Sequence, residues 1–295
     1  MGIRDVVARI FEEVSEAVFP SNIYWIMCGS LIDRSRIYAL CDQCVREMHW
    51  ITGGTCDCCG KALPDTYRGI SSDGRRLCYD CMIRNHYFTK GWSCLSYGLH
   101  ERELMMDIKY NGKGYIARMM GDVMFDRMET LIDAAQEGDD GSFPRIDVVI
   151  PVPVSRKRMV RRGYNQSELM ARQFVRRWRQ HVQHHLHGAV AGNASDRSYC
   201  FCPKLESHIL VRRKATVMLR SLNPEELRLA LHGAFAVNPA LRSRIEDKNI
   251  LLIDDIYTTG ATADACSKVL LEEGAAAVYL LTLCSGGNRK TKDDN

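Results

Sequence analysis

The chain has 295 residues, 46% of them hydrophobic, and a formal net charge of +4 at pH 7. This length and composition predict one main domain with a sizeable core and a smaller module, while the mild charge does not by itself indicate nucleic-acid binding. No apolar run is long enough to cross a membrane, and the acidic residues within positions 1–20 do not fit a secretory signal. We therefore expect a cytoplasmic protein, in which metal ligands explain the 13 cysteines better than disulfides do.

Residues 1–20 are predicted to form an N-terminal amphipathic helix. Apolar residues recur there at helical spacing, acidic residues occupy the other face, and Pro20 ends the pattern. A helix that lies on a membrane surface is normally basic, so we expect this one to pack against the protein.

The region 21–94 contains cysteine pairs with the spacing of metal ligands. The complete set is Cys56, Cys59, Cys78 and Cys81. Each Cys-x-x-Cys turn presents two thiolates to one tetrahedral ion, and two such turns complete a structural zinc site. We therefore predict a zinc ribbon, in which the metal stabilises a module that is too small for a hydrophobic core of its own. Four protein ligands leave no open position for catalysis.

A first set of cysteines in the same region is incomplete. It consists of Cys28, Cys41 and Cys44. Trp25 stands where the leading Cys-x-x-Cys pair would begin. A structural zinc needs four ligands, so either Cys58 or His49 completes the set or the site holds no metal. We interpret the region as a double zinc ribbon whose first site is degenerate.

Residues 95–295 are predicted to form an α/β domain, which begins with two helices. These helices are expected at 103–110 and 116–135. Lys109 and Lys113 flank the glycine-containing turn between them. They are either solvated surface charges or neighbours of a bound phosphate.

A basic segment follows a short predicted strand at 146–150, which ends in two prolines. The loop 154–163 follows a sheet strand, so we expect it to face a ligand crevice and to hold a pyrophosphate. The residues assigned to this role are Arg156, Lys157 and Arg161. Two alternatives are a track for a nucleic-acid backbone and a solvated helix face. Asn165 is the predicted N-cap of the next helix, with Glu168 as its capping-box partner.

Regular patterning is lost between residues 181 and 208. Four of its histidines, at positions 181, 184, 185 and 187, lie close together, but no helical or strand pattern contains them, so we predict a flexible surface insertion. The apolar segment at 209–211 is predicted to resume the sheet, and the segment at 234–237 is predicted to form another strand.

The stretch from Asn249 to Thr262 has the clearest functional pattern. An aliphatic strand at 250–253 ends in Asp254 and Asp255, and small residues then lead into a helix at 262–273. Loop amides and a helix N-terminus favour a phosphate, while carboxylates accept hydrogen bonds from sugar hydroxyls and attract a hydrated divalent cation. The pattern predicts a site for a phosphorylated ribose with Mg²⁺.

A further strand at 278–283 completes a strand–helix–strand unit, which predicts a parallel sheet. Paired acids at a strand end also occur in ATPases, but the chain lacks the Gly-x-x-x-x-Gly-Lys-Ser/Thr loop that those proteins need. A response-regulator receiver would carry its acids near its first strand. Neither class fits this chain.

The segment Ile253-Asp254-Asp255-Ile256-Tyr257-Thr258-Thr259-Gly260-Ala261-Thr262 resembles the phosphoribosyl-pyrophosphate signature of type I phosphoribosyltransferases. The resemblance implies that Asp254 and Asp255 bind the ribose hydroxyls and that Mg²⁺ neutralises the pyrophosphate. The residues implied for the 5′-phosphate are Thr258, Thr259, Gly260, Ala261 and Thr262.

The order of motifs along nearly the whole chain resembles the ComF family of competence-associated proteins. Besides the zinc ribbon and the ribose-phosphate signature, the matching motifs are Pro151-Val152-Pro153, Arg162-Gly163-Tyr164-Asn165-Gln166 and Gly233-Ala234-Phe235. The resemblance implies a type I phosphoribosyltransferase-like parallel sheet flanked by helices and preceded by a small zinc-ribbon module.

The same resemblance implies two kinds of partner. One is phosphoribosyl pyrophosphate with Mg²⁺, which a catalytic protein would use as a phosphoribosyltransferase. The other is single-stranded DNA together with the DNA-uptake machinery of natural competence. The sequence shows no evident general base, so the alternative to an enzyme is a non-catalytic accessory protein. Such a protein would handle single-stranded DNA through the zinc ribbon and the arginine-rich segment.

Overall fold

The computed structural model describes residues 38, 40–137, 143–188, 201–214 and 224–286, and the chain forms two compact units, 1–48 and 49–295. The predicted helix at 1–20 and Cys28 lie outside the described residues. In the first unit, the described part contains helix α2 (Asp42–Glu47), whose N-cap is Cys41. The Cys41 thiol accepts a hydrogen bond from the backbone N–H of Cys44 at 3.1 Å. The two cysteines thus share one tight turn.

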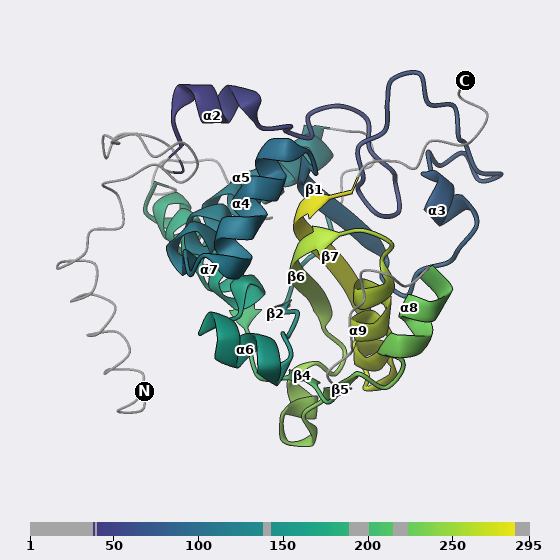
Figure 1. Ribbon diagram of the computed structural model, residues 1–295, viewed down its shortest axis with the longest axis vertical. Helices are drawn as coiled ribbons and strands as arrows, with labels where there is room; N and C mark the ends of the chain where they lie inside the picture. Colours follow the sequence, from purple (N-terminus) through teal and green to yellow (C-terminus); the bar gives the residue numbers. More distant parts are fainter. Residues whose placement is uncertain (1–37, 39, 138–142, 189–200, 215–223, 287–295) are drawn as a thin grey trace. The chain divides into compact units, whose positions relative to one another are not determined.

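A five-stranded parallel sheet forms the centre of the second unit, with the strand order β1-β7-β6-β2-β3 (Figure 1). The strands are β1 (Lys90–Ser96), β2 (Val148–Pro151), β3 (Lys204–Leu205), β6 (Asn249–Tyr257) and β7 (Ala277–Ser285). All neighbouring pairs in this sheet are parallel. The aliphatic run from Ile250 to Ile253 is fully buried in the middle of the sheet, as its lack of polar alternation predicts.

Helices flank the sheet on both faces (Figure 1). They are α3 (Tyr79–Met82), α4 (Leu99–Tyr110), α5 (Gly114–Glu137), α6 (Arg156–Arg162), α7 (Gln166–Gly188), α8 (Pro224–Leu231) and α9 (Ala261–Glu272), with a 3₁₀ helix at Pro239–Arg244. Helices α5 and α7 pack together on one face, where Phe125 meets Phe174 and Trp178 edge to face. Helix α9 packs on the other face, with α8 beside it.

The predicted strand–helix–strand unit is confirmed as β6, α9 and β7, with parallel pairing from Asn249 and Ala277 onward. The prediction that the first strand ends before the two acids is wrong. Strand β6 continues through Asp254 and Asp255 to Tyr257, because β7 runs beside it as far as Ser285 and satisfies its backbone groups.

Two other expectations about secondary structure are also wrong. The loop 154–163 contains α6, which Ser155 caps by accepting a hydrogen bond from the Arg158 N–H. The segment at 209–211 does not rejoin the main sheet. Strands β4 (Leu210–Arg212) and β5 (Phe235–Val237) form a separate antiparallel pair.

The histidines at 181–187 do have a helical frame, because α7 continues to Gly188. Phe174, Trp178 and Val182 are all buried, so the apolar stripe of the helix extends one turn further than the composition suggests. Residues 189–200 of the predicted insertion lie outside the described residues. Among the described residues, no helix is both long and apolar enough to span a membrane.

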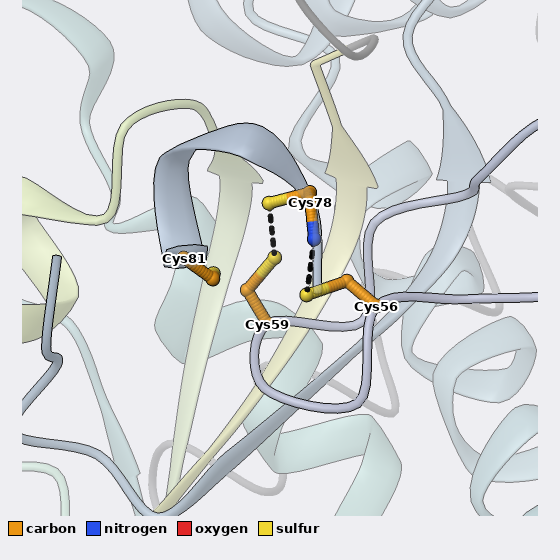
Figure 2. A group of neighbouring side chains, drawn as sticks. All are labelled: Cys56, Cys59, Cys78 and Cys81. Carbon is orange, nitrogen blue, oxygen red and sulfur yellow. Dashed lines mark hydrogen bonds between the residues drawn. The ribbon is translucent and has the colours of Figure 1, made fainter. Parts of the chain in front are cut away.

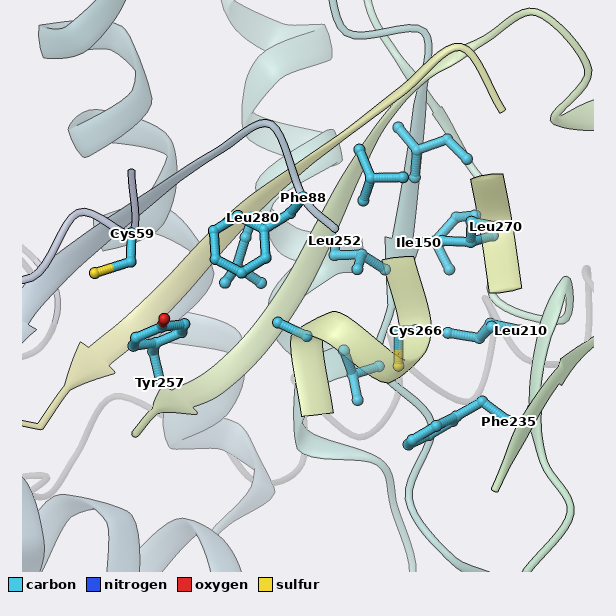
Figure 3. Close-up of a cluster of buried hydrophobic side chains, with 14 of the residues drawn as sticks. Cys59, Phe88, Ile150, Leu210, Phe235, Leu252, Tyr257, Cys266, Leu270 and Leu280 are labelled. Carbon is cyan, nitrogen blue, oxygen red and sulfur yellow. The ribbon is translucent and has the colours of Figure 1, made fainter. Parts of the chain in front are cut away.

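One buried cluster joins the sheet to the cysteine region (Figure 3). It contains Cys59 and Phe88, the sheet residues Leu252 and Leu280, and Tyr257 at the end of β6. The complete set of cysteines therefore shares its packing with the strand that carries the two acids.

Candidate functional site

The predicted zinc ligands converge between the turn that precedes Gly60 and helix α3 (Figure 2). The sulfur atoms of Cys56, Cys59, Cys78 and Cys81 all lie within 4.8 Å of one another, and the Cys59 and Cys78 sulfurs are 3.7 Å apart. Thiolates at 2.3 Å from a tetrahedral zinc are separated by about 3.8 Å. All four side chains are buried. The set fits a structural zinc, as the sequence predicts.

The first set of cysteines is described only in part. Cys41 and Cys44 share a turn, whereas Cys28 lies outside the described residues. The backbone N–H of His49 donates to Glu101 at 2.8 Å, and Cys58 lies beside Cys81. A fourth ligand from His49 or Cys58 stays a prediction.

The two acids of β6 are held by groups from other elements. Ser167 donates to Oδ1 of Asp254 at 3.1 Å, and Gln166 donates to Oδ2 of Asp255 at 2.7 Å. Lys109 at the end of α4 forms an ion pair with the same oxygen of Asp255, at 2.9 Å. The carboxylates are therefore fixed in place before any ligand arrives.

The start of α7 positions Gln166 and Ser167 for these contacts. Asn165 caps the helix by accepting a hydrogen bond from the Ser167 N–H at 3.1 Å, and its amide donates to the carbonyl of Val152 at 3.1 Å. The predicted cap is therefore present, and it ties α7 to the end of β2. Glu168 pairs with Arg172 along the helix.

Burial, and then the charge of Asp255, raise the pKa of Asp254 to about 7. Two neighbouring carboxylates in a poorly solvated place resist joint ionisation. A divalent cation beside them would favour the charged form of both. The pair is thus suited to hold a cation or a polarised hydroxyl.

A cavity of about 390 Å³ opens beside the acids, at the carboxyl ends of β2 and β6. In the sheet, β7 lies next to β6 on one side, and β3 lies next to β2 on the other side. The direction of the strand order therefore reverses between β6 and β2. Parallel α/β sheets bind ligands at such points. Cationic side chains also line the cavity, and they are Arg102, Lys109, Arg158, Arg162 and Arg212.

Two buried polar atoms near the cavity have no hydrogen-bond partner among the described residues. They are Nε of Arg162 and Oγ1 of Thr259. Burial also lowers the pKa of the guanidinium groups of Arg162 and Arg212. Buried polar atoms without partners cost free energy, and an anionic ligand would satisfy them.

The structure distributes the predicted ligand residues over two adjoining hollows. Asp254, Asp255, Thr258 and Thr262 line the main cavity. Thr259, Gly260 and Ala261 line a smaller one of about 30 Å³, to which Thr258 and Thr262 also belong.

The predicted pyrophosphate residues Arg156, Lys157 and Arg161 do not line the main cavity, whereas Arg158 and Arg162 do. Residues four apart share one face of a helix, and α6 turns this face toward the acids. A helix in place of a loop therefore changes which basic residues line the cavity.

Several lining residues were not predicted from the sequence. Lys109 was one of two lysines with an open role, and its ion pair with Asp255 places it in the site. Arg212 and Ser167 carried no signal of their own, and Gln166 was named only as the last residue of the motif that begins at Arg162. They come from segments whose contact with β6 depends on the order of the strands.

Comparison with known proteins agrees with this architecture. A family model described as a double zinc ribbon domain matches residues 14–100. The DNA utilization protein YhgH of Escherichia coli (strain K12) is 23% identical over 257 residues, which cover 83% of this chain and 95% of that protein. The competence protein ComFC of Bacillus subtilis is 24% identical over 273 residues, 89% of each chain.

The competence protein F of Haemophilus influenzae is also similar, at 24% identity over 245 residues that cover 81% of this chain and 94% of that protein. These relatives align over most of their length, and the zinc-ribbon match covers the cysteine region that precedes the parallel sheet. The chain is therefore similar over most of its length to proteins of the ComF family.

Proposed function

We propose that the cavity beside Asp254 and Asp255 binds phosphoribosyl pyrophosphate, or a closely related phosphorylated ribose, together with Mg²⁺. The observation that carries this proposal is that acidic and basic side chains line the same cavity. The two acids of β6 line this cavity together with arginines from α6 and β4. A ligand with sugar hydroxyls and phosphates needs both kinds of group.

Each part of the ligand would have its own partners. Ribose hydroxyls would donate to Asp254 and Asp255. The 5′-phosphate would accept from the loop at 258–262, where α9 begins and the Thr259 hydroxyl is unsatisfied among the described residues. The pyrophosphate would lie toward Arg158 and Arg162, with Mg²⁺ near the acids.

The proposal concerns binding first, because no histidine or cysteine is among the described lining residues, and Asp254 and Asp255 would be engaged by the ribose and Mg²⁺ rather than free to act as a general base. In a transfer reaction, the bond between the anomeric carbon and the pyrophosphate oxygen would break as the acceptor bond forms. Arg158 and Arg162 would then stabilise the departing pyrophosphate electrostatically.

Isothermal titration calorimetry with phosphoribosyl pyrophosphate tests this function. We expect Mg²⁺-dependent binding to the wild-type protein and its loss in the double variant Asp254→Asn/Asp255→Asn. The exposed Asp65→Asn is a control that should bind normally. Absence of binding to the folded wild-type protein, or equal binding to the double variant, contradicts the proposal.

We also propose that the chain acts in the uptake or use of DNA, since the relatives carry the names DNA utilization protein and competence protein. A specific surface supports contact with single-stranded DNA. The basic residues of α6 and α7 that are exposed are Arg156, Lys157, Arg161, Arg172, Arg176 and Arg179. They are available to phosphates of a nucleic-acid backbone.

Fluorescence anisotropy of a labelled single-stranded oligonucleotide over a salt series tests the second function. Each lost phosphate contact should reduce the salt slope by about 0.7. We expect Lys157→Gln/Arg161→Gln to weaken binding and reduce the slope, and the exposed Lys248→Gln to have little effect. Identical slopes in all three proteins argue against this surface. The two experiments are independent, because the exposed residues do not line the cavity.

A further inference from the structure

We propose that Cys58, Cys81 and His86 form a second metal site beside the four-cysteine site, with Cys81 as a thiolate that bridges two ions. This site is separate from the incomplete set at Cys28, Cys41 and Cys44. It would make the cysteine region around α3 a two-metal centre.

The three ligand atoms lie within 4.8 Å of one another. Cys81 is buried, Cys58 is half-buried, and the side chain of His86 is only 1% exposed. Zinc ligands lie 2.0–2.3 Å from the metal and therefore about 3.4–3.8 Å from one another, so the set needs to contract by roughly 1 Å. Cys58 already belongs to the turn that carries Cys56 and Cys59, and its carbonyl accepts a hydrogen bond from the Gly91 N–H at 2.7 Å.

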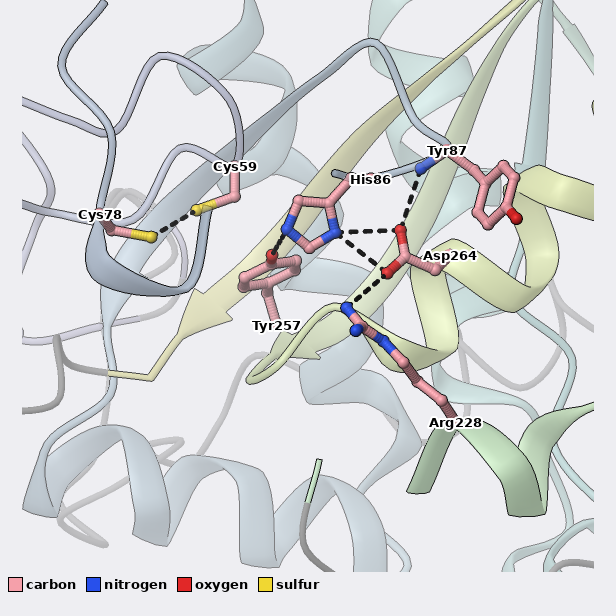
Figure 4. A network of polar contacts seen from close by, with 7 residues as sticks. All are labelled: Cys59, Cys78, His86, Tyr87, Arg228, Tyr257 and Asp264. Carbon is pink, nitrogen blue, oxygen red and sulfur yellow. Dashed lines mark hydrogen bonds and ion pairs between the residues drawn. The ribbon is translucent and has the colours of Figure 1, made fainter. Parts of the chain in front are cut away.

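His86 is held in the orientation of a metal ligand (Figure 4). Its Nδ1 lies 3.0 Å from both carboxylate oxygens of Asp264, so a neutral ring donates this N–H and keeps its lone pair on Nε2. The Nε2 atom lies on the side of the ring that faces Cys59 and Cys78 in Figure 4. Carboxylate–histidine pairs of this kind orient metal-binding imidazoles.

Contacts with other residues hold the Asp264 carboxylate in place, independently of the His86 ring. Its carboxylate accepts a hydrogen bond from the Tyr87 N–H at 3.1 Å and forms an ion pair with Arg228 at 3.4 Å. The Tyr257 hydroxyl lies 3.4 Å from Nε2 of His86, so a metal ion at Nε2 would replace this contact, and a water would be the fourth ligand.

The charge of the four-cysteine site also favours a second cation. Four thiolates around one divalent ion leave a buried excess of negative charge, which is costly without a counter-ion. Lys61 is buried nearby, but it is paired with Asp80 at 3.0 Å. A second divalent ion, bound by the Cys58 thiolate and a neutral His86, reduces the excess by one charge.

Counting metal ions in the full-length chain tests the site. Native mass spectrometry with elemental analysis after loading with Zn²⁺ should find one ion fewer per chain in Cys58→Ser and in His86→Ala than in the wild-type protein. Cys202→Ser, which removes a half-buried cysteine outside the cluster, should lose none. Equal metal content in the wild-type protein and His86→Ala overturns the site. Loss in Cys58→Ser alone also overturns it, because Cys58 would then serve the first set.

Two further measurements do not depend on the folding of these variants. X-ray absorption of the wild-type protein loaded with Zn²⁺ should show nitrogen ligation and a metal–metal scattering path, and absence of that path overturns the bridge. In Asp264→Asn, a chelator titration should find that the more weakly held ion loses 10–100-fold in affinity while the other is unchanged. An unchanged affinity for both ions contradicts the role of Asp264.

Discussion

Lys109 Nζ lies 2.9 Å from Oδ2 of Asp255, and this ion pair joins the last turn of α4 to strand β6. The two side chains are 18% and 9% exposed, so solvent screens the pair only weakly. The same carboxylate oxygen accepts a hydrogen bond from Gln166. Lys109 would therefore compete with a divalent cation for the carboxylate of Asp255.

Replacing Lys109 by Met should leave Asp255 as a buried charge without its ion-pair partner. We expect the free energy of unfolding to fall by about 2–4 kcal/mol, somewhat below the loss typical of a fully buried pair. Mg²⁺ should then restore more stability than it adds to the wild-type protein, because Lys109 no longer competes for the carboxylate. Urea denaturation with and without Mg²⁺ measures both effects.

Lys113→Met is the matched control for this change. Lys113 pairs with Asp107 at 2.8 Å, but its side chain is 39% exposed, so its loss should cost at most about 1 kcal/mol. Equal destabilisation in the two variants would show that the ion pair with Asp255 contributes no more to stability than the more exposed pair of Lys113 with Asp107.

The raised pKa of Asp254 predicts how stability depends on pH. Its carboxyl has a pKa of about 7 in the folded protein, against 3.8 for the ordinary group, because of burial and the charge of Asp255. Between these values the folded state keeps a proton that the unfolded state has released. The free energy of unfolding should therefore fall as the pH rises from about 4 to about 7, and the loss should be complete above the folded pKa.

Denaturation of wild-type protein and Asp254→Asn over this pH range measures the effect. The difference between the two curves isolates Asp254 from the other titrating groups, and it should be steepest between the unfolded and folded pKa values and level off above the folded one. Parallel curves for the two proteins contradict the assignment. A saturating concentration of Mg²⁺ should shift the transition of the wild-type protein to lower pH, because the cation favours the ionised carboxylate.

Much of the central architecture could be predicted because its signals are local. The run at Ile250–Ile253 is aliphatic without alternation, which indicates a strand buried on both faces, and the spacing to α9 and β7 leaves only a parallel crossover. The ligands Cys56, Cys59, Cys78 and Cys81 were predictable for a similar reason. Two Cys-x-x-Cys turns define a four-ligand site without knowledge of the fold.

The rest of the site depends on contacts between distant segments. Strand β1 escaped prediction because its buried residues include Ser93 and Cys94 and lie next to the cysteine region. Arg212 reaches the cavity from β4, which belongs to a different sheet from β6. No local sequence pattern specifies this contact between β4 and the cavity, since it follows from how the strands and helices pack together.

Removal of zinc from the four-cysteine site should affect more than the ribbon. Cys59 and Cys78 share a buried cluster with Phe88 and with Tyr257 at the end of β6. We expect a strong chelator to lower the melting temperature and to increase amide hydrogen exchange in the segment 256–262. Exchange in α7, which packs on the opposite face of the sheet, should change much less. If the increase in amide hydrogen exchange is confined to residues 54–82, the zinc site is not coupled to the segment 256–262.

A substitution at Gly260 tests how much space there is in the loop at 258–262, which we propose binds the phosphate. It has a φ of 78°, and a side-chain Cβ there would meet the Tyr257 hydroxyl and the His86 ring, each at 2.8 Å. Gly260→Ala should therefore cost about 1–2 kcal/mol for the left-handed backbone, with a further loss from the clash. Binding of phosphoribosyl pyrophosphate should weaken in parallel, because the displaced loop no longer presents its amides.

Gly74→Ala separates the backbone cost from the clash. Gly74 has a similar φ of 83°, but no atom of the described residues lies within 4 Å of a Cβ at this position. We expect only the backbone cost in this variant, and unchanged ligand binding. If thermal denaturation finds the same loss in both variants, the loop has room to accommodate the methyl group. The close approach of His86 and Tyr257 would then not be what holds the loop in shape for a phosphate.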